Sequence, residues 1–92
     1  MARLSDAEID ERLGRLSGWE RSGDAIVKQF ENGDFKGSVD FVNRLTPEAE
    51  AMGHHPDLEI SWKTVKVTIT THSEGGLTDK DFELARRIDE LG

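Results

Sequence analysis

Residues 58–72 read Leu-Glu-Ile-Ser-Trp-Lys-Thr-Val-Lys-Val-Thr-Ile-Thr-Thr-His, and this stretch decides the fold. It is rich in β-branched residues, which are typical of strands. Within residues 64–72 an apolar side chain recurs at every second position, so an extended segment would have one apolar and one polar face. The apolar set is Val65, Val67 and Ile69. The stretch therefore predicts two strands, over residues 58–62 and 64–72, in a sheet with one covered face.

A helical pattern precedes these strands. From Phe35 to Met52, apolar residues recur at steps of three and four, which is typical of one face of a helix. Asp34 is suited to cap its amino end, and Gly53 to close its carboxyl end. Proline lacks a backbone N–H, so the Thr46-Pro47 pair predicts a kink or a restart at that point, with Thr46 as a new cap.

Two further helices are indicated by capping boxes, in which a Ser or Thr precedes an acidic residue by three positions. One box spans Ser5–Glu8 and predicts a helix ending near Ser17-Gly18, and the other spans Thr78–Asp81. Residues 19–21 and 25–30 flank the turn residues 22–24 and predict a hairpin. The order α-β-β-α-β-β-α favours an α+β fold, with a four-stranded antiparallel sheet and helices packed on one face.

Composition narrows the functional classes. A chain of 92 residues suits a single domain over residues 1–92. It contains no cysteine, which excludes disulfides and thiolate catalysis and suits a reducing compartment. The net charge of −7 opposes binding to nucleic acid. Without a long apolar run or an apolar signal core at the amino end, we expect a cytoplasmic protein with no membrane association.

All three histidines fall in one pattern, Glu-x3-His-His-Pro-x5-Trp-x9-His-x8-Asp, which runs from Glu50 to Asp81. Histidine has an unperturbed pKa near neutrality, so it can give or take a proton at physiological pH. Three histidines with two carboxylates suggest proton-transfer chemistry on a small molecule.

Simpler interpretations exist for each part of this pattern. A His-His-Pro turn alone is typical of a protein surface, Asp81 alone of a capping box, and Trp62 of a core or an interface. Histidines with a carboxylate can also hold zinc, but adjacent histidines lack the usual ligand spacing and no His-Glu-x-x-His is present. We therefore expect no metal site.

The complete pattern resembles the signature of the pterin-4a-carbinolamine dehydratases. The similarity rests on Glu50-Ala-Met-Gly-His54-His55-Pro56, Trp62, Thr71-His72 and Gly76-Leu77-Thr78-x-x-Asp81, and it extends to Gly18-Trp19, Asp24 to Phe30 and Asp34-Phe35. Three positions depart from common members of that family: Trp62 stands in place of a tyrosine, Gly53 of an aspartate and Lys80 of an arginine.

The resemblance implies an enzyme of pterin recycling. Its expected reaction is dehydration of 4a-hydroxytetrahydrobiopterin to quinonoid dihydropterin, without a cofactor, for an aromatic amino acid hydroxylase such as that of phenylalanine hydroxylation. The implied catalytic residues are His54, His55 and His72. The implied substrate-binding residues are Glu50, Gly53, Pro56, Thr70, Thr71, Ser73 and Asp81. An alternative is a non-catalytic pterin-binding module, or a dimerisation and coactivator module, on the same fold.

Self-association is also expected. The core of so short a chain is small, and a four-stranded sheet leaves edge strands that need cover. Phe41 lies beside the main apolar stripe of its helix and would widen the face available to a partner. These features predict a homodimer or homotetramer.

Overall fold

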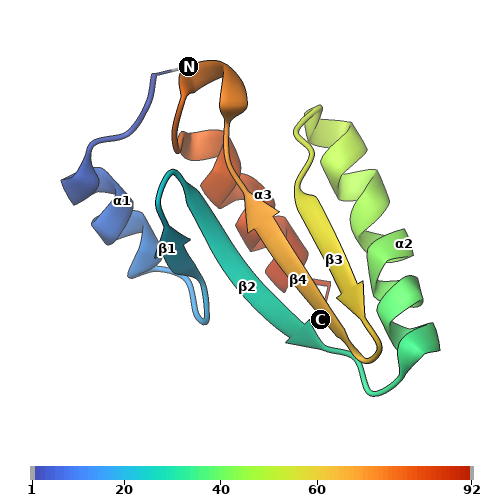
Figure 1. Ribbon diagram of the computed structural model, residues 1–92. Coiled ribbons are helices and arrows are strands. Elements are labelled where there is room, and N and C mark those ends of the chain that lie inside the picture. Colours follow the sequence, from blue (N-terminus) through green and yellow to red (C-terminus); the bar gives the residue numbers. More distant parts are fainter. Residues whose placement is uncertain (1, 92) are drawn as a thin grey trace.

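The computed structural model describes residues 2–91, which form helices and strands in the predicted order (Figure 1). The elements are α1 (Asp6–Leu13), β1 (Glu20–Ser22), β2 (Ala25–Glu31), α2 (Phe35–Met52), β3 (Asp57–Ser61), β4 (Thr64–Ile69), the short 3-10 helix η1 (His72–Glu74) and α3 (Asp79–Asp89). The predicted α+β class is therefore confirmed.

The strands form one antiparallel sheet in the order β1-β2-β4-β3. Both hairpins turn over two residues, because Ser22 pairs with Ala25 and Ser61 pairs with Thr64. Such tight turns need positive φ angles. Gly23 adopts one at no steric cost, but Trp62 also has a φ of 51°. The prediction that Trp62 ends a strand is wrong, because it lies in the turn with 68% of its surface exposed.

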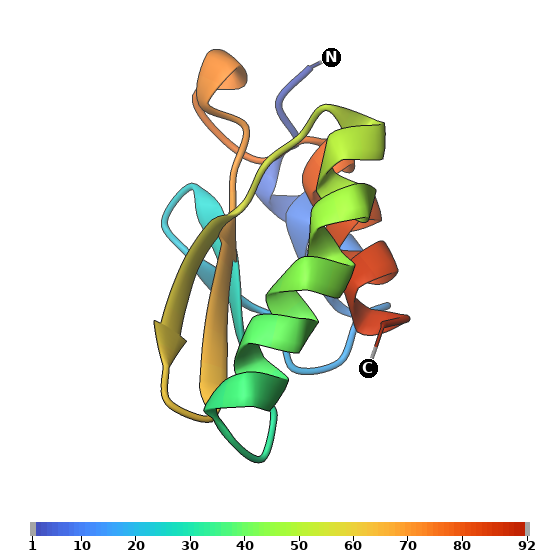
Figure 2. The same cartoon turned by 90° about the vertical axis from the view of Figure 1, so that its right-hand side faces the viewer.

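The helices cover one face of the sheet, as Figure 2 shows from the side. The predicted alternation in β4 is confirmed, since Val65, Val67 and Ile69 are completely buried. They pack with residues of the three α-helices into one core, which also includes Ile9, Ile26, Phe41, Leu45, Leu84 and Ile88. Burial of this apolar surface drives the helices onto the sheet.

The helix caps predicted at Ser5, Asp34, Gly53 and Thr78 are confirmed. Ser5 and Thr78 each form a capping box, Asp34 accepts a hydrogen bond from the Gly37 backbone, and Gly53 ends α2 in the left-handed conformation. The carboxyl end of α1 differs from the prediction, because the helix stops at Leu13 and not near residue 17.

Helix α2 continues unbroken through Pro47, so the predicted restart is wrong. Thr46 does not act as a new cap. Its hydroxyl donates back to the Val42 carbonyl, one turn earlier in the same helix, at 2.8 Å. The buried stripe of α2 also differs from the prediction: Phe41 lies in the core and Phe35 is exposed. Phe41 is therefore not available to a partner.

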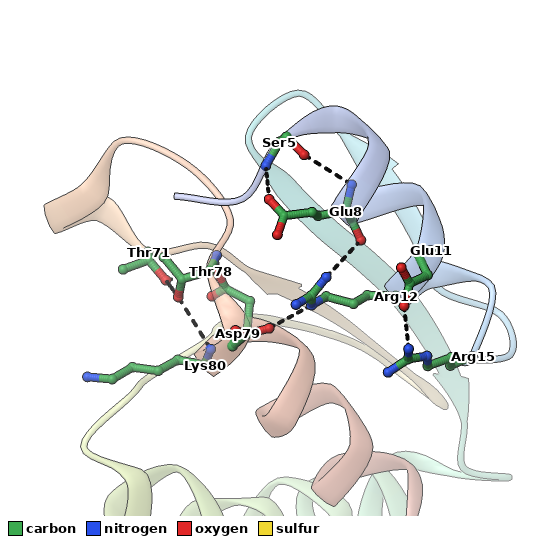
Figure 3. A network of polar contacts seen from close by, with 10 residues as sticks. Ser5, Glu8, Glu11, Arg12, Arg15, Thr71, Thr78, Asp79 and Lys80 are labelled. Atoms are coloured by element: carbon green, nitrogen blue, oxygen red, sulfur yellow. Dashed lines mark hydrogen bonds and ion pairs between the residues drawn. The ribbon is translucent and has the colours of Figure 1, made fainter. Parts of the chain in front are cut away.

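A polar contact fixes α1 beside the start of α3 (Figure 3). The Arg12 guanidinium donates to the Asp79 carboxylate at 2.6 Å. The Leu4 backbone N–H also donates to the Leu77 carbonyl, at 2.8 Å. Together the two contacts hold the amino-terminal segment near the loop that precedes α3. Across residues 2–91, the helices are too short or too polar to span a membrane.

Candidate functional site

His54 and Asp81 form the centre of the candidate site. His54 follows the left-handed Gly53 that ends α2, and Asp81 lies in the first turn of α3. The His54 Nε2 atom lies 2.6 Å from Asp81 Oδ1. Only 11% of the His54 side chain is exposed, and none of Asp81. A buried carboxylate therefore holds one nitrogen of the imidazole ring in place.

The second oxygen of Asp81 is fully occupied by groups of the loop before α3. Asp81 Oδ2 accepts a hydrogen bond from the Thr71 hydroxyl at 2.8 Å and another from the Thr78 backbone N–H at 2.9 Å. The two threonine hydroxyls are themselves 2.9 Å apart. Figure 3 shows Thr71 and Thr78 beside each other at the start of α3. These contacts meet the need of a buried charge for hydrogen-bonding partners.

Thr78 is the member of this group that the sequence interpretation missed. The sequence places Thr78 in a capping box, which accounts for its backbone bond to Asp81, and in the family signature, but not among the expected site residues. The signal for a second contact is weak in the sequence, because nothing in the spacing of Thr71 and Thr78 shows that their hydroxyls meet. The isolated bridge between Thr71 and Gly76 brings the two ends of the loop together.

His55 and Glu50 form a separate, exposed pair. His55 Nε2 contacts Glu50 Oε2, and more than half of each side chain is open to solvent. The pair lies at the carboxyl end of α2, directly beside His54 in the chain. Two histidines of the signature are thus each joined to a carboxylate, one buried and one exposed.

His72 lies in a different position from the one predicted. Strand β4 ends at Ile69, and His72 begins η1, so its side chain does not belong to the polar face of the strand. His72 and the neighbouring Ser73 are both exposed. Among residues 2–91, no hydrogen bond or ion pair joins the His72 side chain to another residue. The loop that carries it lies at the same end of the molecule as the 53–56 segment (Figures 1 and 2).

The remaining predicted site residues surround this end of the molecule. Gly53 is exposed, and Pro56 and Thr70 are half-buried. The Thr70 hydroxyl donates to the Asp24 carbonyl in the β1–β2 turn, so it is directed away from the histidines. Thr71 is only 7% exposed, and its hydroxyl is occupied by Asp81 and Thr78.

Histidine and carboxylate side chains are also the usual ligands of a metal ion. Among the described residues 2–91, no group of three or more His, Asp or Glu side chains is positioned to hold a metal ion. A polar hollow of about 340 Å³ lies near the loop, lined in part by Arg3, Asp6, Arg21 and Leu77. None of the histidines lines it, and Arg21 already forms an ion pair with Asp6. The hollow is therefore not part of the histidine site.

Comparison with known sequences identifies the family to which this fold and site belong. The model of the pterin 4 alpha carbinolamine dehydratase family matches residues 2–91, and this chain belongs to that family. A protein of Roseiflexus sp. (strain RS-1), provisionally named a pterin-4-alpha-carbinolamine dehydratase, is 54% identical over 89 residues, with 97% of this chain and 96% of that one covered. A Thermosynechococcus vestitus protein of the same provisional name is 52% identical, with 97% and 94% covered.

Solved structures agree with the fold. A transcriptional coactivator/pterin dehydratase from Brucella melitensis superposes with a TM-score of 0.92 at 34% identity, over 97% of each chain. A pterin dehydratase-like protein described as a RuBisCO assembly factor in the alpha-carboxysome gives a TM-score of 0.65 at 22% identity, covering 79% of this chain and 84% of that one. The second likeness concerns the fold alone.

Proposed function

We propose that this protein removes water from 4a-hydroxytetrahydrobiopterin to give quinonoid dihydropterin, by general acid and base catalysis at its histidines. The observation that carries the proposal is the buried Asp81 held against His54, which leaves the other ring nitrogen of His54 without a partner among residues 2–91. A histidine oriented by a carboxylate in this way is suited to accept a proton, because the carboxylate stabilises the imidazolium that results.

The dehydration requires only the transfer of protons. The C4a–O bond breaks and the hydroxyl leaves as water after receiving a proton, while N5 loses its proton and a C4a=N5 double bond forms. One group must donate and another must accept, and both must work near neutral pH. Histidine meets this requirement, because its unperturbed pKa lies near the working pH. The net reaction needs neither an oxidant nor a metal.

The three histidines divide these tasks in the proposal. His54 and His72 are the leading base and acid, and His55, paired with Glu50, holds the substrate and assists. The exposed position of His72 supports its role, since a proton donor must reach substrate that arrives from solvent. Gly53, Pro56, Thr70 and Ser73 lie in the segments that flank these histidines, where their backbone groups can contact the pterin ring.

The decisive experiment measures turnover of freshly generated 4a-hydroxytetrahydrobiopterin by ultraviolet absorbance. We expect a rate well above the uncatalysed dehydration, unchanged by treatment with a chelator. A rate equal to the uncatalysed one, in a protein that still binds a stable pterin by calorimetry, would favour the alternative of a non-catalytic pterin-binding module. Loss of activity on chelation, together with about one metal ion per chain, would overturn the acid–base proposal.

The substrate sets the biological setting of the proposal. A 4a-hydroxylated tetrahydropterin arises when an aromatic amino acid hydroxylase uses its cofactor, so a hydroxylase is the expected functional partner. We also propose that the chain acts as a homodimer or homotetramer. The exposed apolar side chains Ile60 and Trp62, which lie in and beside the edge strand β3, support this part of the proposal.

A further inference from the structure

Asp81 is surrounded by groups whose hydrogen-bond directions can be deduced. The Thr78 backbone N–H can only donate, and it donates to Asp81 Oδ2. The Thr71 hydroxyl also donates to Oδ2 and so uses its single hydrogen there. Its contact with the Thr78 hydroxyl, at 2.9 Å, must then be one in which Thr78 donates and Thr71 accepts. The Thr78 oxygen in turn accepts from the Lys80 backbone N–H at 3.3 Å.

This chain of donors fixes the orientation of the Asp81 carboxylate. Oδ2 is on the side that must accept two hydrogen bonds, so Oδ1 is the atom presented to His54. Since an ionised carboxylate can only accept, His54 must donate from Nε2. The neutral ring then carries its hydrogen on Nε2 and a free electron pair on Nδ1. Within residues 2–91, Nδ1 has no hydrogen-bonding partner in the protein.

We propose that Thr71 and Thr78 are positioning residues that act through Asp81 to make Nδ1 of His54 the proton-accepting atom. The inference rests on the proposed function for the reaction that it serves, but the tautomer itself is a property of the free protein. It also changes the assignment of Thr71, whose buried hydroxyl is engaged by Asp81 and Thr78 and is not offered to a ligand.

Asp81→Asn provides the sharpest test, because an amide has one accepting and one donating end. The Thr71 hydroxyl and the Thr78 N–H require the amide oxygen on their side, so the NH2 group faces His54 Nε2. Nε2 must then accept, and the ring hydrogen moves to Nδ1. Long-range ¹⁵N–¹H NMR of the ligand-free protein should show the Nε2–H tautomer of His54 in the wild type and the Nδ1–H tautomer in Asp81→Asn.

Thr71→Val removes the hydroxyl and nearly preserves the side-chain shape, whereas Thr71→Ser keeps the hydroxyl. The Asp81 carboxylate of Thr71→Val can still only accept, so we expect the Nε2–H tautomer of His54 to remain in both variants, and the loss of the Thr71 hydrogen bond to show in the rate of catalysis. In dehydration assays kcat should fall by about tenfold or more for Thr71→Val with KM nearly unchanged, which is the effect expected for loss of an orienting partner. Thr46→Val is the matched control, because it deletes an exposed hydroxyl of α2 that bonds only to the Val42 carbonyl.

The possible outcomes separate the two proposals. An Nε2–H tautomer retained in folded Asp81→Asn would overturn the positioning role even if the wild type is an active dehydratase, and so would a wild-type kcat in folded Thr71→Val. An inactive wild type with the expected tautomer change would overturn the proposed function and leave the positioning of His54 supported. If Thr71→Val does not fold, the Asp81→Asn spectrum decides the matter alone, since that variant retains the size and shape of the native side chain.

Discussion

His54 and Asp81 are 27 positions apart in the chain, and the carboxylate of the second is sealed from solvent by the imidazole of the first and by the loop before α3. The contact therefore stabilises the fold as well as orienting the imidazole ring. His72, in contrast, is exposed, and among residues 2–91 its side chain forms no hydrogen bond or ion pair.

The two histidines should consequently differ in their effect on stability. His54→Ala leaves a buried carboxylate without one of its hydrogen bonds, which should lower the free energy of unfolding by about 1–3 kcal/mol. His72→Ala should change it by less than about 0.5 kcal/mol, as is usual for an exposed residue. Urea denaturation followed by circular dichroism measures both. Equal stability of the two variants would contradict the buried position of the His54–Asp81 pair.

The same two substitutions should affect catalytic activity differently from stability. If His54 and His72 handle the two proton transfers, each alanine variant should retain measurable dehydration, with a loss of at most about 10²–10⁴-fold. The double variant should lose much more than either single one, because both the proton acceptor and the proton donor are then missing. Rates are compared in preparations shown to be folded. Wild-type activity in the folded double variant would exclude both residues from catalysis.

Ser38 is a polar residue buried in the core. Its hydroxyl is buried in α2 and, among the described residues, is the one buried side-chain N or O atom without a hydrogen-bonding partner. Burying a hydroxyl without a partner costs free energy, and alanine is also the better helix former. Ser38→Ala should therefore raise the free energy of unfolding by about 1 kcal/mol. Asn43→Ala, at an exposed position of the same helix, controls for helix propensity, and an equal gain there would remove the argument from burial.

Acid should weaken an ion-pair cluster on α3. Hydrogen bonds from Arg86 and Arg87 lower the pKa of Glu83 to about 2, from an ordinary value of 4.5. A lowered carboxyl pKa means that the stabilisation is complete above pH 4.5 and is lost as the pH falls towards 2. The stability difference between wild type and Glu83→Gln should follow this course and stay constant from about pH 6 to 8. Because 38% of the Glu83 side chain is exposed, added salt should reduce the difference.

Self-association should depend on the β3 edge. Ile60, 43% exposed, lies on this edge strand, which pairs with β4 on one side only, so a charge placed there should oppose pairing with another copy. Light scattering should give a dimer or tetramer mass for the wild type and a smaller mass for Ile60→Glu. Gln29→Glu adds the same charge on the inner strand β2 and should leave the mass unchanged. A wild-type mass near the 10.3 kDa of one chain, at micromolar concentration, would contradict the proposed oligomer.

Local patterns in the sequence were enough to predict the elements of the fold. The capping box at Ser5, the alternation in β4 and the glycine after α2 each depend on neighbouring residues, and each is present in the structure. The errors arose where packing overrides local preference. Tertiary contacts keep α2 continuous at Pro47, and the tight β3–β4 turn places Trp62 in a conformation that few non-glycine residues adopt.

The candidate site was predictable as a set of residue types but not as an arrangement. The sequence pattern includes His54, Asp81 and Thr71, but their mutual contacts depend on how the loop before α3 folds against the end of α2. Periodicity also assigned His72 to a strand, since residues 70–72 continue the alternation of β4. Such a pattern does not indicate where hydrogen bonding to the neighbouring strands ceases, and here the last paired residue is Ile69.

The backbone bond from Leu4 to Leu77 has a practical consequence for handling the protein. It ties the amino-terminal segment to the loop from which His72, Thr71 and Thr78 extend, and the Arg3 guanidinium donates to the Gly75 carbonyl of the same loop. An affinity tag or reporter fused ahead of Arg3 would therefore emerge beside the loop that carries His72 in the proposed site. The carboxyl end of α3, where the Leu91 carbonyl accepts from Arg44 in α2, lies at the opposite end of the molecule and is the better place for a label.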